Sequence, residues 1–128
     1  MLRSLVVVGG FLLLILTVCP VWAIEAVEAT MTTAIIDREP VDRVEAFPLQ
    51  NGKLYCFTRI VGAEGQTVVK HLWYRGTQLM SRVEFPVNAP DCMTLSAILF
   101  QEDWAGEWLV EVQDAEERIM QTVYFQLR

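Results

Sequence analysis

Alternation with a period of two over residues 53–85 constrains the fold of this chain most strongly. Small or apolar residues occupy every second position from Leu54 to Ile60, and polar or aromatic residues fall between them. Successive side chains of a β-strand point to opposite faces, so this pattern predicts a strand. Residues 67–75 are rich in β-branched and aromatic side chains, and residues 79–85 alternate again. The segment therefore predicts three consecutive strands.

Two glycine-containing segments separate these strands. Residues 62–65 (Gly-Ala-Glu-Gly) suit a hairpin loop. Gly76 and Thr77 lie where a two-residue hairpin turn would fall, because glycine adopts positive φ without steric cost. We therefore expect two successive hairpins.

The rest of the chain continues the β pattern. A first strand is expected over residues 31–36, ended by Pro40, which cannot donate to a ladder. Val41, Val44 and Phe47 are spaced to reach a core from a loop. Residues 86–91 contain two prolines and suit a crossing from one sheet to another.

Further strands are expected over residues 93–100, 107–114 and 119–127. The strand at 107–114 should point Trp108, Val110 and Val112 inward, and the one at 93–100 should be covered on both sides. About seven short strands separated by turns predict an all-β fold. We expect one small antiparallel β-sandwich of immunoglobulin-like architecture over residues 31–128.

An apolar N-terminal segment precedes the predicted domain. Arg3 is followed by an uncharged run from Leu5, and Val21-Trp22-Ala23 offers a cleavage site, so residues 1–23 predict a signal peptide. The alternative is an uncleaved anchor over residues 1–24, which would be the only membrane contact. Residues 24–30 are expected to be a short tether. The protein should be exported to the periplasm or beyond the cell, or be anchored to the inner membrane.

Charge and composition exclude several classes of partner. The sequence contains ten Lys and Arg and sixteen Asp and Glu, which gives a formal net charge of −6. An acidic chain is a poor ligand for nucleic acid or for an anionic membrane surface. The sequence has one histidine, no metal-ligand spacing, no phosphate-binding glycine loop and no nucleophile motif. We therefore expect no enzyme activity, no catalytic residues, no metal and no cofactor.

The two cysteines of the predicted domain allow two interpretations. Cys56 and Cys92 can form a disulfide if the protein is exported, or they can be buried thiols that pack as small apolar groups.

One face of the predicted strands is the candidate ligand site. His71 would supply a polar contact within a patch lined by aromatic rings, and such a patch would suit a glycan or a cell-wall fragment. The opposing interpretation is that these side chains are core and that the histidine is hydrogen-bonded inside the sandwich. The candidate residues are Tyr55, Phe57, Arg59, His71, Trp73 and Tyr74.

Four ordered motifs carry a resemblance to a known family. They are residues 37–40 (Asp-Arg-Glu-Pro), 52–60 (Gly-Lys-Leu-Tyr-Cys-Phe-Thr-Arg-Ile), 71–74 (His-Leu-Trp-Tyr) and 104–112 (Trp-Ala-Gly-Glu-Trp-Leu-Val-Glu-Val). Together they resemble the bacterial domain of unknown function 2914 family, over about residues 36–127. The resemblance implies a small β-sandwich module, often outside the cytoplasm or attached to other domains, and brings no activity with it.

The chain departs from this family between the third and fourth motifs. Relatives tend to carry an Arg-Thr-Trp/Tyr-Ser-Ser-Lys-like run, whereas residues 93–98 read Met-Thr-Leu-Ser-Ala-Ile. If that run binds an anion in relatives, the function is lost here. The overall expectation is a non-catalytic exported module for protein interaction or envelope structure, with an unknown envelope protein as its partner. The alternative is a module that binds a carbohydrate or cell-wall ligand.

Overall fold

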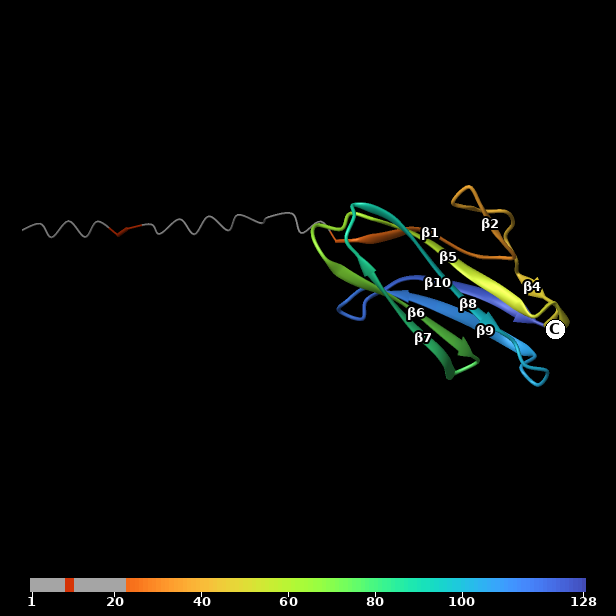
Figure 1. Cartoon of the computed structure of the whole chain (residues 1–128). Helices are drawn as coiled ribbons and strands as arrows, with labels where there is room; N and C mark the ends of the chain where they lie inside the picture. Colours follow the sequence, from red (N-terminus) through yellow and green to blue (C-terminus); the bar gives the residue numbers. More distant parts are fainter. Residues whose placement is uncertain (1–8, 11–22) are drawn as a thin grey trace, which may run out of the picture.

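The computed structural model describes residues 9–10 and 23–128, and the fold is all-β, as predicted (Figure 1). The predicted signal peptide or anchor falls almost entirely outside the described residues. Within the described part, no helix is long and apolar enough to cross a membrane.

Seven strands of eight to ten residues form the body of the domain, with three two-residue strands beside them. A 3-10 helix, η1 (Leu49–Asn51), precedes Gly52, whose φ is 82°. The strands are β1 (Glu25–Thr32), β2 (Ile35–Ile36), β3 (Glu39–Pro40), β4 (Ala46–Phe47), β5 (Lys53–Val61), β6 (Thr67–Arg75), β7 (Gln78–Val87), β8 (Asp91–Leu99), β9 (Gly106–Gln113) and β10 (Ile119–Leu127).

Two sheets make the sandwich. The smaller sheet has the order β1-β5-β8, and the larger has the order β4-β10-β9-β6-β7. All pairings in them are antiparallel except the short one between β4 and β10. The strands β2 and β3 form a separate hairpin. Figure 1 shows the two layers, with this hairpin beside β1.

The inward faces of the two sheets form the core. In β9, Trp108, Val110 and Val112 are all at most 2% exposed, which confirms the predicted alternation. An aromatic cluster fills one end, where Trp73 and Trp108 meet Phe125 with ring centroids 6.0 Å apart in each pair. Aromatic side chains bury large apolar areas, so this cluster contributes to the stability of the sandwich.

The prediction of two successive hairpins is half right. β6 and β7 form the expected hairpin, with Arg75 opposite Gln78 across Gly76 and Thr77. The loop at residues 62–65 is not a hairpin loop, because β5 belongs to the smaller sheet and β6 to the larger. The loop at residues 88–90 crosses between sheets as expected, since β7 and β8 also lie in different sheets.

The predicted tether is wrong for most of its length. Residues 25–30 belong to β1, which pairs with β5, and Ala26 and Thr30 are only 5% and 4% exposed. Side chains of the last turn and strand hold this segment: Arg118 donates to the Ile24 carbonyl and Gln121 to the Ala26 carbonyl. The domain therefore begins near Ile24, and the expected first strand over 31–36 is divided between β1 and β2.

Two expected core contacts are absent. Val41 is 46% exposed, whereas Phe47 is buried and Val44 is partly buried against the core. Leu99 is 70% exposed, because it ends an edge strand, so the prediction that this segment is covered on both sides is wrong.

The β2–β3 hairpin lies over the outer face of the smaller sheet. Asp37 and Arg38 make its two-residue turn with φ of 51° and 65°, the left-handed region used by tight hairpins. Asp42 fixes its base, accepting hydrogen bonds from Thr32 Oγ1 at 2.6 Å and Thr33 Oγ1 at 2.6 Å. These bonds lower the pKa of Asp42 below its usual value.

Candidate functional site

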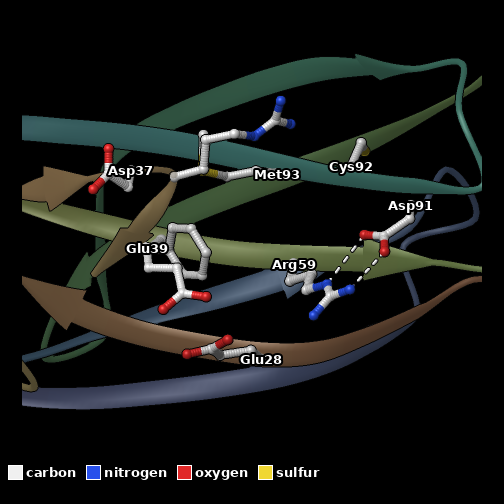
Figure 2. Close-up of a pocket in the computed structure, with 9 residues that line it drawn as sticks. Glu28, Asp37, Glu39, Arg59, Asp91, Cys92 and Met93 are labelled. Carbon is white, nitrogen blue, oxygen red and sulfur yellow. Dashed lines mark hydrogen bonds and ion pairs between the residues drawn. The ribbon is translucent and has the colours of Figure 1, made fainter. Parts of the chain in front are cut away.

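A groove between the β2–β3 hairpin and the outer face of the smaller sheet is the first candidate site (Figure 2). Its volume is about 400 Å³. Strands β1, β5 and β8 supply its floor and far wall, and the hairpin supplies the near wall. The lining residues are Glu28, Asp37, Arg38, Glu39, Phe57, Arg59, Asp91, Cys92 and Met93.

A bidentate ion pair crosses the floor of this groove from β5 to β8. Arg59 Nε lies 3.1 Å from Asp91 Oδ1, and Arg59 Nη2 lies 2.6 Å from Asp91 Oδ2, as Figure 2 shows. The hydrogen bonds from Arg59 lower the pKa of Asp91, and those to Asp91 raise the pKa of Arg59. Both side chains are about half exposed, so the pair adds little stability. Its effect is to neutralise the Arg59 charge in a fixed orientation.

The remaining charge of the groove is acidic. Three further carboxylates line it, at Glu28, Asp37 and Glu39, against one further guanidinium at Arg38. Arg43 reaches Glu28 only at 3.8 Å and is itself 75% exposed, so that contact is loose. Phe57 and Met93 add apolar surface to the lining. The groove can therefore receive a side chain that has an apolar stem and a positive end.

A second polar group lies between the sheets, centred on His71. The imidazole is 0% exposed, with Nδ1 2.6 Å from Ser96 Oγ and Nε2 3.2 Å from the hydroxyls of both Thr58 and Thr94. Trp73 Nε1 donates to the same Ser96 Oγ at 3.0 Å. Both ring nitrogens of His71 have a hydrogen-bond partner when the Ser96 hydroxyl donates to Nδ1 and Nε2–H donates to a threonine hydroxyl. Ser96 Oγ then still accepts the hydrogen bond from Trp73 Nε1.

This cluster supports the structural interpretation of His71. Burial lowers the pKa of His71 to about 4, so the ring is neutral near pH 7. Its partners are uncharged hydroxyls, and its edge meets the Phe85 ring with centroids 4.8 Å apart. Among the described residues, no buried side-chain nitrogen or oxygen lacks a hydrogen bond, and no three His, Cys, Asp or Glu are placed to hold a metal.

The six side chains predicted to share one ligand face do not share it. His71 and Trp73 are both 0% exposed between the sheets, so they cannot contact a ligand at the surface. The physical reason is that the inward face of β6 packs against the smaller sheet, and the aromatic and imidazole rings fill that space.

The other four predicted residues are divided between the two outer faces. Tyr55, Phe57 and Arg59 alternate with the inward residues of β5 and so lie on the outer face of the smaller sheet. Phe57 is only 3% exposed, although it lines the groove. Lys53 Nζ lies 5.1 Å from the centre of the Tyr55 ring, a cation–π contact. Tyr74 lies on the outer face of the larger sheet, on the opposite side of the molecule.

The proposed disulfide is not formed, because the strand register keeps the two cysteines apart. Cys56 lies opposite Ser96 and Cys92 lies opposite Ile60, four residues further along each strand. That offset is about 13 Å along the strands, far beyond the reach of a disulfide. Both thiols are free, Cys56 in the core and Cys92 partly buried.

A row of apolar side chains on the outer face of the larger sheet was not predicted as a site. Strand pairing places Tyr124 of β10 opposite Leu109 of β9, Leu109 opposite Tyr74 of β6, and Tyr74 opposite Leu79 of β7. Tyr124 is 69% exposed and Leu79 is 47% exposed. The alternation of Tyr124 with Val123 and Phe125 could have placed it outward, but only the strand order brings it into line with Tyr74.

A hollow of about 420 Å³ lies beside Tyr124. Its polar lining consists of Glu45, Glu107 and Gln126, and no Lys, Arg or His lines it. Trp108 and Phe125 complete the lining, although both side chains are almost wholly buried.

The comparison with sequence families matches one continuous part of the chain, from β6 to β10. Residues 66–127 match the family described as "Protein of unknown function (DUF2914)". Over these residues the chain is similar to the DUF2914 family. The DUF2914 match spans β6 to β10 and contains the third and fourth sequence motifs, whereas the first and second lie before it. It confirms the resemblance inferred from the motifs, and the DUF2914 description assigns no function.

Other comparisons add little to the DUF2914 match. No curated protein matches the chain. A mutant (D270A) β-glucosidase from Listeria innocua in complex with laminaribiose shares 10% identity at a TM-score of 0.49, covering 79% of this chain and 16% of that one. A β-D-glucoside glucohydrolase from Trichoderma reesei shares 11% identity at a TM-score of 0.47, covering 83% and 19%. The chain spans less than a fifth of the length of either enzyme.

Proposed function

We propose that this domain is a non-catalytic binding module of the cell envelope, and that it holds a partner protein in the groove beneath the β2–β3 hairpin. The observation that carries this proposal is the charge of the groove. Once Arg59 and Asp91 neutralise each other, three carboxylates remain against one guanidinium around a hollow of about 400 Å³. The partner therefore presents a lysine or arginine side chain to the groove.

The shape of the groove supports the same ligand. Glu28 and Glu39 come from opposite walls, β1 and the hairpin, and in Figure 2 both carboxylates lie on the same side of the Arg59–Asp91 pair. A cationic end group between them would gain from both charges. The apolar contribution of Phe57 and Met93 suits the methylene stem of such a side chain.

The non-catalytic part of the proposal rests on the state of the titratable groups. His71, the one histidine in the sequence, is buried, neutral and hydrogen-bonded to hydroxyl groups. Cys56 is buried, and its pKa is raised to about 12 by burial, so it is not a nucleophile. The location of the module outside the cytoplasm rests on the apolar run and cleavage pattern of residues 1–23.

An NMR titration with tetralysine tests the ligand class. Amide shifts are expected to be concentrated at Glu28, Glu39, Arg59 and Met93, and to shrink as salt is raised, because exposed charges are screened. Tetraglutamate is the control peptide and should leave these amides unmoved. The double substitution Glu28→Gln, Glu39→Gln should remove the response to tetralysine.

A response spread evenly over all acidic segments, including residues 114–117, would contradict the proposal. It would mean that the peptide follows the net charge of the chain and not the groove. No response at the groove would contradict it equally.

A further inference from the structure

The outer face of the larger sheet carries a feature that the groove does not explain. Tyr124, Leu109 and Tyr74 occupy one row across three adjacent strands, so the two tyrosines lie two strand spacings apart. That distance is about 10 Å. Neighbouring inward residues, Trp73 and Phe125, are buried, which fixes both tyrosines on the outward face.

Exposure at the two ends of this row needs a reason, because large apolar side chains are often buried, and Leu109 and Tyr74 between the ends are partly exposed. Tyr124 is 69% exposed, and Leu79, at the far end of the row, is 47% exposed. Tyrosine on a rigid strand presents an apolar ring and a hydroxyl at low cost in side-chain entropy. Such a ring stacks on the apolar face of a sugar, and its hydroxyl bonds to the sugar hydroxyls.

The hollow beside Tyr124 supplies the complementary polar groups. Glu45 and Glu107 offer carboxylate acceptors, and Gln126 offers an amide that both donates and accepts. These groups match the many O–H donors of an uncharged sugar. Two carboxylates without a cation in the lining oppose an anionic ligand.

We propose that the outer face of the larger sheet binds an extended, uncharged oligosaccharide. One sugar ring stacks on Tyr124, with its hydroxyls donating to Glu45 and Glu107, and a second ring stacks on Tyr74. The distance between the tyrosines suits alternate rings of an extended β-linked chain, with Leu109 beneath the ring between them. This surface lies on the opposite side of the sandwich from the groove, so it constitutes a second binding site.

The test uses isothermal titration calorimetry of the full chain with two uncharged β-1,4-linked probes, cellohexaose and the hexamer of N-acetylglucosamine. At least one hexamer is expected to bind. Tyr124→Ala and Tyr74→Ala should each weaken binding by about tenfold, the loss expected for one stacked ring. Tyr124→Phe should retain most of the affinity because the ring remains.

Matched controls separate this site from the groove. Tyr55→Ala removes a tyrosine from the opposite face and should leave hexamer binding unchanged. The double substitution Glu28→Gln, Glu39→Gln should also leave it unchanged, although it removes the response to tetralysine. Failure of the groove proposal therefore leaves this one standing, and the reverse also holds.

Two outcomes overturn the proposal. The first is that neither hexamer binds, or that Tyr124→Ala and Tyr74→Ala both bind the hexamers as tightly as the natural chain does. The second is that sedimentation velocity shows a dimer which Tyr124→Ala abolishes while neither hexamer binds. The row would then be an interface between two copies of this chain.

Discussion

At His71, burial determines whether the imidazole ring carries a second proton. The ring is enclosed by Ser96, Thr58 and Thr94, none of which carries a charge. A charged imidazolium here would lose its hydration and gain no counter-ion, which is why the pKa of His71 falls from 6.5 to about 4. Protonation of this residue is therefore linked to unfolding.

We predict that His71 makes the domain acid-sensitive between about pH 6.5 and pH 4. In this window the unfolded chain binds a proton that the folded chain does not, so the free energy of unfolding decreases as pH falls. A shift from 6.5 to about 4 corresponds to a loss of roughly 3 kcal/mol across the window. Urea unfolding at several pH values measures it. His71→Gln should show a flatter profile, and a profile parallel to that of the natural chain would contradict the prediction.

The two cysteines should differ in reactivity in the native protein. Burial raises the pKa of Cys56 to about 12 and removes it from solvent, whereas Cys92 is partly buried, with a pKa raised by burial and by Asp91. Iodoacetamide at pH 8, followed by peptide mass spectrometry, should label Cys92 and leave Cys56 unmodified. Both should react in urea. Equal labelling under native conditions would show that the core opens at Cys56.

At the scale of elements, the turns determine which strands become neighbours. The β9–β10 turn is organised by Asp114, which accepts hydrogen bonds from the backbone N–H groups of Glu116 and Arg118 and from Arg118 Nε. Glu117, inside this turn, has a φ of 66°. A side chain is strained there, because its Cβ crowds the backbone in the left-handed region.

We therefore predict that Glu117→Gly increases the free energy of unfolding by about 0.5–1 kcal/mol, since glycine adopts this φ freely. Glu116→Gly is the matched control and should decrease stability by a similar amount, because a glycine at negative φ only adds freedom to the unfolded chain. Thermal unfolding of the two variants measures the difference. Equal destabilisation by both would show that Glu117 is not strained.

Local patterns predicted strands better than they predicted pairings. The β6–β7 turn follows from Gly76, and the core face of β9 follows from the alternation of Trp108, Val110 and Val112. The loop at 62–65 looks locally like a hairpin loop, but β5 pairs with β1 and β8, which are distant in sequence. Pairing between distant strands depends on how the two sheets pack, and no short stretch of sequence contains that information.

The candidate sites show the same difference between what local patterns predict and what strand pairing determines. Arg59 and Tyr74 were predicted as site residues and are accessible, but they lie on opposite faces. Asp91 and Glu28 were missed because they reach the groove only through the pairing of β5 with β8 and β1. Residues 25–30, with two glutamates and three alanines or valines, have little strand propensity of their own, and the edge of β5 supplies their structure.

At the scale of the whole molecule, deletion of most of β1 tests where the domain begins. We predict that a chain starting at residue 31 loses cooperative thermal unfolding, whereas a chain starting at residue 23 keeps it. Removal of residues 25–30 leaves residues 57–61 of β5 unpaired along one side and uncovers the core beside Ile60 and Val69. Circular dichroism melting compares the two chains. Equal midpoints would support the tether that the sequence first suggested.

The strand order also has a consequence for the order in which the parts of the molecule fold. The larger sheet contains two hairpins between consecutive strands, β6–β7 and β9–β10, whereas no two strands of the smaller sheet are consecutive in sequence. Closing long loops is slow, and local hairpins form early. β1 can therefore pair only after β5 is available, and β5 pairs along its second edge only after the chain as far as β8 has folded back onto it. We expect the smaller sheet, and with it the groove, to be the last part of the molecule to form.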